Sequence, residues 1–167
     1  MKLAYIMSSR RGGTDRVLGE FAALCEQQGV KLAGVVQTNT ECAPSHLCDM
    51  DVRVLPDGPV LRISQSLGAG SKGCRLDASV LEEAVGHANA SLSDDAQLLL
   101  INKFGKREAE GHGFRAVISD AVLRGIPVVL GVNDANLAAF LDYADGMADR
   151  LNDNVDDLQK WYSKNAT

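Results

Sequence analysis

The amino-acid sequence predicts an α/β fold of three layers, in which a mostly parallel sheet is covered by helices on both faces. Short apolar runs at residues 2–7, 31–37, 97–101 and 127–132 alternate with stretches of helical period. This alternation is typical of parallel strands joined by crossover helices. The chain has 167 residues, of which 46% are hydrophobic and 23% charged, so we expect one folded domain over residues 1–167.

The expected elements follow one another in a simple order. A strand at 2–7 leads through a loop at 8–14 into a helix from about Asp15, and a second strand follows at 31–37. Strands at 50–55 and 60–64 flank a Pro-Asp-Gly-Pro turn and predict a β-hairpin insertion. The remaining pattern predicts a helix from the cap Asp77 to about Ala88, a strand at 97–101, a helix at 114–123, a last clear strand at 127–132, and helices at 135–143 and 155–163.

Charge, hydropathy and cysteine usage narrow the classes of partner. A net charge of −5 disfavours a nucleic-acid partner held by a basic face, but it is compatible with a small anionic ligand at a local basic cluster. Residues 1–7 are too few to span a membrane and lack the features of a secretion signal. We therefore expect no membrane insertion and a cytoplasmic location. The 4 cysteines are irregularly spaced, which predicts reduced thiols rather than disulfides.

The segment from Ser8 to Asp15 is the first candidate site. It lies between a buried strand and a helix start, where backbone N–H groups and the helix dipole favour a bound anion. In the phosphate-loop pattern G-x-x-x-x-G-K-[ST], Ser8 replaces the first glycine, Thr14 the lysine and Asp15 the metal-binding hydroxyl residue. The alternative is a solvated turn. The residues predicted to bind the anion are Ser9, Arg10, Arg11, Gly12, Gly13 and Thr14.

A glycine-rich loop at residues 68–73 is the second candidate. It matches G-x-G-x-x-G, but the predicted helix starts only at Asp77 and no acid ends the next strand, so we reject dinucleotide binding. Lys72 and Arg75 are predicted to close over an anion held by the first loop. The alternative is a connection whose glycines relieve backbone strain.

A polar segment at residues 102–113 follows a buried strand and is the third candidate. Open α/β sheets bind ligands at this edge. Asn102 and Lys103 stand where phosphate-loop enzymes carry an acid for Mg²⁺, and Lys103 is predicted to bind the anion. Glu108 and Glu110 are weak candidates for a catalytic acid, with surface solvation as the alternative.

A cluster of metal-binding residue types, Cys42, His46 and Cys48, lies in a stretch without helical or strand period. These side chains bind soft metals, but their spacing is not that of a standard zinc site and no second ligand pair is present. We therefore predict no metal site.

Several motifs together resemble the thermophilic-type nucleoside-triphosphatases, a family of small P-loop proteins. They are the strand–loop–helix opening, the hairpin at 51–64, Gly-Cys-Arg-Leu-Asp at 73–77 and Phe-Gly-Lys-Arg-Glu at 104–108. The resemblance covers most of residues 2–132 and implies a P-loop NTPase-like fold. Active members hydrolyse nucleoside triphosphates with Mg²⁺, and the Asp-Glu pair that they carry falls on Asn102 and Lys103 here.

The chain is more similar still to a bacterial family that is related to those enzymes and often encoded beside molybdate-transport genes. The similar patterns are at 63–65, 73–77, 102–113 and 125–127, together with the tail around Trp161. This resemblance implies that the ligand is a nucleotide with Mg²⁺ or an oxyanion such as molybdate.

The leading hypothesis is a P-loop-like protein with degenerate catalytic motifs, which binds a compact anion with little or no hydrolysis and is accessory to molybdenum metabolism. One alternative is an active Mg²⁺-dependent nucleoside-triphosphatase, in which Asp15, Glu108 or Glu110 holds the metal. Another is a non-catalytic module that binds a protein partner. The sequence leaves the oligomeric state open, with a homo-oligomer as one option.

Overall fold

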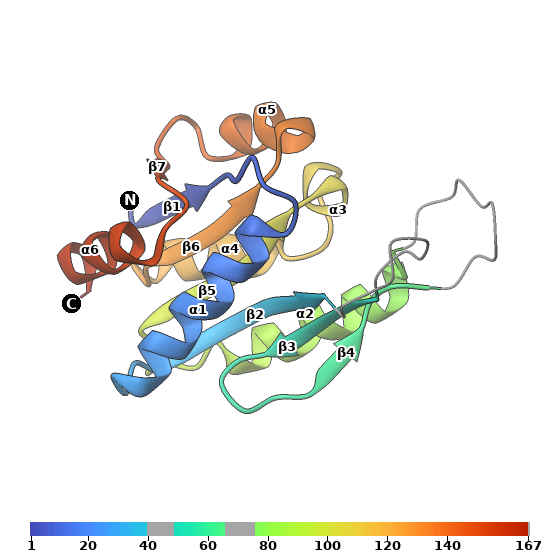
Figure 1. Ribbon diagram of the computed structural model, residues 1–167, viewed down its shortest axis with the longest axis horizontal. Helices are drawn as coiled ribbons and strands as arrows, with labels where there is room; N and C mark the ends of the chain where they lie inside the picture. Colours follow the sequence, from blue (N-terminus) through green and yellow to red (C-terminus); the bar gives the residue numbers. More distant parts are fainter. Residues whose placement is uncertain (40–48, 66–75, 167) are drawn as a thin grey trace.

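A computed structural model describes residues 1–39, 49–65 and 76–166 and confirms the predicted α/β architecture (Figure 1). The described strands form one seven-stranded sheet in the order β4-β3-β2-β5-β6-β1-β7. Parallel pairing joins β1 (Leu3–Ile6), β2 (Leu32–Asn39), β5 (Leu98–Phe104), β6 (Val128–Val132) and β7 (Asp149–Leu151) into the larger part of the sheet.

The predicted hairpin insertion is present at one edge of the sheet. Its strands are β3 (Met50–Val54) and β4 (Val60–Arg62), which pair antiparallel, and β3 also pairs antiparallel with β2. The turn between them contains the Pro-Asp-Gly-Pro sequence, as expected from its turn-forming residues. The hairpin therefore widens the sheet on the side away from β1.

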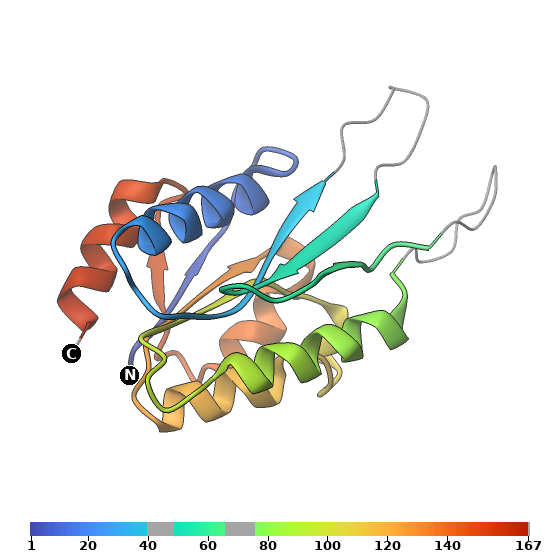
Figure 2. The ribbon, with the colours of Figure 1, turned by 90° about the horizontal axis from the view of Figure 1, so that it is seen from below.

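Helices cover both faces of the sheet, as Figure 2 shows. On one face lie α1 (Gly13–Gln27) and α6 (Val155–Asn165), whose buried side chains, such as Phe21 and Trp161, form one apolar cluster with the sheet. The other face carries α2 (Ala78–Ser91), α4 (Arg115–Leu123) and α5 (Asp134–Tyr143), with Leu81, Ile118 and Phe140 in a second cluster. Because helices cover both faces of the sheet, its strands must be apolar on both sides.

The cap predicted at Asp77 is confirmed. Its side chain accepts hydrogen bonds from the backbone N–H groups of Ser79 and Val80, so it satisfies two of the donors that the start of α2 would otherwise leave unpaired. Hydrogen bonds from Ser79 and Val80 hold the pKa of the Asp77 carboxyl below its ordinary value.

Two expectations need correction. Residues 149–151 form a strand, β7, which the sequence did not predict because a short, mostly exposed Asp-Arg-Leu segment lacks an apolar run. The strand predicted at 97–101 continues to Phe104 as β5, and the expected polar turn after it contains the short helix α3 (Lys106–Ala109). In the sheet, β5 and β6 lie between β2 and β1.

Cys25 is the cysteine that lies within the described residues, and its thiol is free and buried on α1. Burial, with a smaller contribution from the neighbouring Glu26, raises the pKa of this thiol to about 12. The thiol therefore stays protonated and serves as a small apolar side chain. Cys42, Cys48 and Cys74 lie outside the described residues.

None of the helices in the described part of the chain has the length and apolar character needed to cross a membrane.

Candidate functional site

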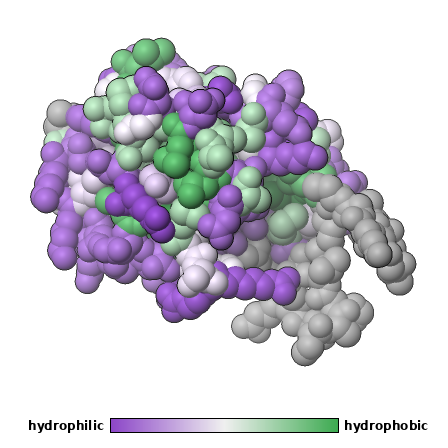
Figure 3. Space-filling view, turned by 90° about the horizontal axis from the view of Figure 1, so that it is seen from above, coloured by the Kyte–Doolittle hydropathy of each residue, from purple (hydrophilic) through white to green (hydrophobic). Residues whose placement is uncertain are grey.

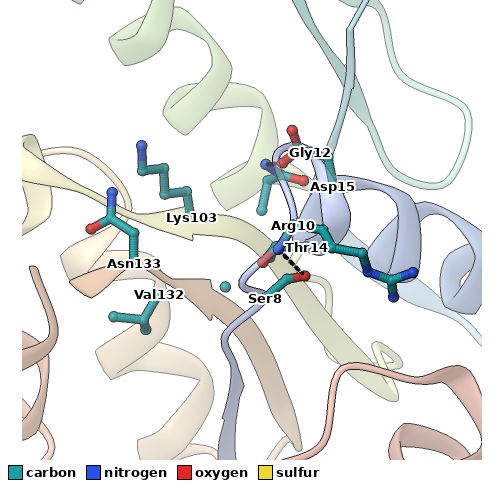
Figure 4. Close-up of a pocket in the computed structure, with 10 residues that line it drawn as sticks. Ser8, Arg10, Gly12, Thr14, Asp15, Lys103, Val132 and Asn133 are labelled. Atoms are coloured by element: carbon teal, nitrogen blue, oxygen red, sulfur yellow. Dashed lines mark hydrogen bonds between the residues drawn. The ribbon is translucent and has the colours of Figure 1, made fainter. Parts of the chain in front are cut away.

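A cavity of about 190 Å³ lies at the carboxyl ends of β1, β5 and β6 (Figure 4). Parallel α/β sheets place ligand sites at this edge, because the loops after neighbouring strands meet there. The cavity is formed by the loop before α1 on one side and by the ends of β5 and β6 on the other. Its lining residues are Ser8, Arg10, Gly12, Thr14, Asp15, Asn102, Lys103, Gly131, Val132 and Asn133.

The loop on one side of the cavity folds tightly upon itself. The backbone N–H of Arg10 donates to Ser8 Oγ at 3.2 Å, and that of Gly13 donates to the Arg10 carbonyl at 3.0 Å. Gly12, the cap of α1, has a φ of 69°, which favours glycine. A Cβ atom on Gly13 would lie 2.1 Å from Ser8 Oγ, so this position has no space for a side chain. Both predicted glycines thus bring the backbone and the N-terminus of α1 to the cavity, an arrangement suited to anions.

A buried amide connects this loop to the sheet. Asn102, at 4% exposure, donates through Nδ2 to Asp15 Oδ1 at 2.7 Å and to Gln37 Oε1 at 3.4 Å. Its Oδ1 accepts from the backbone N–H of Gln37 at 2.9 Å. The acid therefore lies on α1 and the amide near the end of β5. P-loop enzymes instead carry a hydroxyl residue at the first of these places and a carboxylate at the second.

Three residues of β6 and its following loop, Gly131, Val132 and Asn133, line the cavity and were not singled out from the sequence. A Cβ atom on Gly131 would lie 2.4 Å from both the Asn102 carbonyl oxygen and Thr14 Cγ2, so the bare backbone lets β5 and α1 approach. The side chain of Asn133 caps α5 by accepting from the N–H of Asn136. A lone glycine in an apolar strand and an Asn-Asp pair before a helix are the signals that indicate such positions.

The predicted anion-binding residues divide into those at the cavity and those elsewhere. Figure 4 shows Lys103 and Asn133 on the side opposite the loop, while the Arg10 guanidinium points away from them. That guanidinium lies 3.9 Å from Asp153. Ser9 and Arg11 are exposed and do not line the cavity. Lys72 and Arg75, like Cys42, His46 and Cys48, lie outside the described residues.

Glu108 and Glu110, the weak candidates for a catalytic acid, occupy different environments. Glu108 is 3% exposed, and its two carboxylate oxygens accept from the backbone N–H groups of Gly105 at 2.9 Å and Phe114 at 3.0 Å. Glu110 is about half exposed, and its carboxylate lies 3.8 Å from the Lys106 ammonium. The contacts of Glu108 tie together both ends of the segment that follows β5, which supports a structural role.

The replacement Glu108→Gln is expected to lower the free energy of unfolding by about 2–3 kcal/mol. The glutamine amide nitrogen would face a backbone N–H donor, so one buried donor loses its acceptor and a charge-assisted hydrogen bond is lost. Urea unfolding of the purified variant measures the effect. The matched control is Glu110→Gln, for which we expect a change within about 0.5 kcal/mol. Equal stability of the two variants would contradict the structural role of Glu108.

The sheet order and the glycine-containing loop before α1 give the chain a P-loop NTPase-like fold. The chain belongs to the family described as "Protein of unknown function (DUF2478)", whose model matches residues 3–161. A curated relative, the molybdenum import ATP-binding protein ModC 2 of Bradyrhizobium diazoefficiens, is 29% identical over 161 residues. The aligned part is 96% of this chain but 18% of that protein.

Two solved structures have a similar fold. The solution structure of a human cancer-related nucleoside triphosphatase has a TM-score of 0.60 at 15% identity, over 91% of this chain and 88% of that one. The crystal structure of THEP1 from the hyperthermophile Aquifex aeolicus has a TM-score of 0.55 at 15% identity, over 98% of this chain and 96% of that one. At this identity the similarity concerns the fold.

Proposed function

We propose that the cavity binds a compact anion, either the phosphates of a nucleotide or an oxyanion such as molybdate, and that nucleotide hydrolysis is weak or absent. The observation that carries the proposal is the convergence of the α1 N-terminus, the Thr14 side chain and Lys103 on one cavity. Backbone N–H groups and an ammonium are suitable donors for a phosphate or another tetrahedral oxyanion. The volume of about 190 Å³ is suited to a compact group.

The curated relative supports the choice of ligands. Its name describes ATP binding and molybdenum import, and nearly the whole of this chain aligns with a part of it. We therefore propose a role in molybdenum metabolism. The cytoplasmic location and a homo-oligomer or protein partner stay predictions.

The residues at the cavity do not match the Mg²⁺ site of hydrolysing P-loop enzymes. In those enzymes a hydroxyl from the loop and an aspartate from a strand end hold the ion. Here the strand end carries Asn102, and the carboxylate on α1, Asp15, accepts the hydrogen bond of its amide. The described residues contain no group of three or more His, Cys, Asp or Glu that could hold a metal ion. This donor set supports binding without efficient hydrolysis.

The replacement Lys103→Met tests the proposed site. We expect wild-type protein to bind at least one of pyrophosphate, ATP, molybdate or tungstate, and Lys103→Met to weaken that binding about tenfold, since a charge-assisted hydrogen bond is lost. Isothermal titration calorimetry measures the dissociation constants, and a phosphate-release assay with ATP measures hydrolysis.

Lys160→Met serves as the control, because Lys160 is exposed on α6 and does not line the cavity. It removes the same charge from the protein, so a loss of binding confined to Lys103→Met assigns the anion to the cavity. Absence of binding by all four compounds would end the proposal. Rapid ATP hydrolysis by the wild type would favour the active nucleoside-triphosphatase instead.

A further inference from the structure

A second hollow, of about 330 Å³, adjoins the loop cavity on the side of the hairpin. Both spaces are lined by Asp15, Asn102 and Lys103, so they meet at the hydrogen-bonded pair described above. Towards the right of Figure 3, hydrophobic surface is visible beside hydrophilic residues. The apolar lining of the hollow comes from β2, β3, α2 and adjacent segments and includes Val35, Met50, Val52, Ile63, Leu81 and Phe114.

The charged side chains that line this hollow are three cations and two carboxylates. The cations are Lys103, Lys106 and Arg107. Arg107 Nη2 donates to Glu82 Oε1 at 3.3 Å, whereas its Nε is buried and has no hydrogen-bond partner among the described residues. Such an unpaired buried donor is costly unless a ligand supplies an acceptor.

The carboxylates at this hollow are already engaged. Glu108 accepts two backbone N–H groups, and Asp15 accepts from the Asn102 amide. The three cations of the lining exceed its two carboxylates by one positive charge, which favours an acidic group. An apolar space with a few polar groups is the usual form of a small-molecule site.

We propose that this hollow binds a small organic acid with an apolar body about the size of one ring system, whose acidic group faces Lys106 and Arg107. The site is separate from the loop cavity, and its occupant lies next to the anion held there. The volume of about 330 Å³ is at the lower end of the range for ligand pockets, which excludes large ligands. The apolar lining favours burial of the body, and the charged side chains of Lys106 and Arg107 favour the acidic group.

Naphthoate is a suitable probe because it joins a flat apolar body to a carboxylate, and naphthylmethanol is its neutral counterpart. We expect naphthoate to bind the wild-type chain in calorimetry at least about tenfold more tightly than naphthylmethanol. Met50→Trp fills the hollow from β3 and is expected to weaken naphthoate binding about tenfold or more. Val60→Trp adds the same ring on the exposed face of β4, away from the hollow, and is expected to leave binding unchanged.

Two further measurements separate this site from the loop cavity. Circular dichroism and thermal unfolding establish that the two tryptophan variants are folded, and pyrophosphate titration reports the loop cavity independently. Naphthoate binding that is weakened by Met50→Trp but not by Val60→Trp supports the proposal, whether or not pyrophosphate binds. Equal binding of acid and alcohol, equal effects of the two variants, or no naphthoate binding would overturn it. Loss of pyrophosphate binding alone would count against the proposed function and leave the second site intact.

Discussion

Replacement of Phe104 by alanine is expected to lower the free energy of unfolding by about 3–5 kcal/mol, a large fraction of the stability of a domain of this size. Phe104 ends β5 and is fully buried. Its ring centroid lies 5.2 Å from that of Phe140 and 5.4 Å from that of Tyr143, both on α5. Truncation therefore leaves a cavity beneath the site and removes two ring contacts. Equilibrium unfolding in urea gives the change.

Two matched variants show whether the effect comes from the ring contacts. Phe104→Leu retains most of the volume and is expected to cost less than about 1.5 kcal/mol. Val60→Ala on the exposed edge strand should change stability by no more than about 0.5 kcal/mol. A cost below about 1 kcal/mol for Phe104→Ala would mean that α5 is not held to β5 by these rings.

The architecture was predictable because local patterns determine most of it. Apolar runs separated by helical periods predict the parallel strands, and Pro-Asp-Gly-Pro predicts the hairpin. The cap at Asp77 was predictable for the same reason, since its hydrogen bonds reach only to Ser79 and Val80. Each of these features depends on residues that are close in the sequence.

The parts that escaped prediction depend on contacts between distant residues. The Asn102 amide bonds to Asp15, 87 positions away, and no local pattern indicates this pair. The strand β7 has three residues, and it pairs with β1, which is remote in the sequence. Gly131 lies close to the backbone of β5 and to the side chain of Thr14, and both are remote from it in the sequence.

The sequence therefore predicted where the cavity lies but not all of the residues that line it. Loop position and helix start pointed to residues 8–15 and to the end of β5, where the cavity lies. Which basic side chains face it is a matter of side-chain direction: Lys103 lines the cavity, whereas Arg11 does not. Sequence spacing does not specify that difference. The buried contacts of Glu108 likewise depend on how the segment after β5 turns back to Phe114.

Gly131→Ala is expected to weaken anion binding about tenfold or more and to lower the free energy of unfolding by about 1–3 kcal/mol. The added Cβ would lie 2.4 Å from the Asn102 carbonyl oxygen and from Thr14 Cγ2. The carbonyl belongs to the backbone and cannot rotate away, so β5, β6 or the start of α1 has to shift. Each of these elements lines the cavity proposed to bind the anion, and the donors of that cavity would lose their alignment. Calorimetry with the tightest anion and urea unfolding measure the two effects.

A glycine in open space provides the control that separates crowding from a general effect of alanine. Gly86 lies within α2, and a Cβ there would have no neighbour within 4 Å. Gly86→Ala is expected to raise stability by about 0.5–1 kcal/mol through helix propensity and to leave anion binding unchanged. Because both variants add one methyl group, opposite signs in stability attribute the loss at Gly131 to the contact between β6, β5 and α1. Wild-type affinity in Gly131→Ala would instead mean that the anion does not depend on this close approach, and the site would have to be sought outside the cavity.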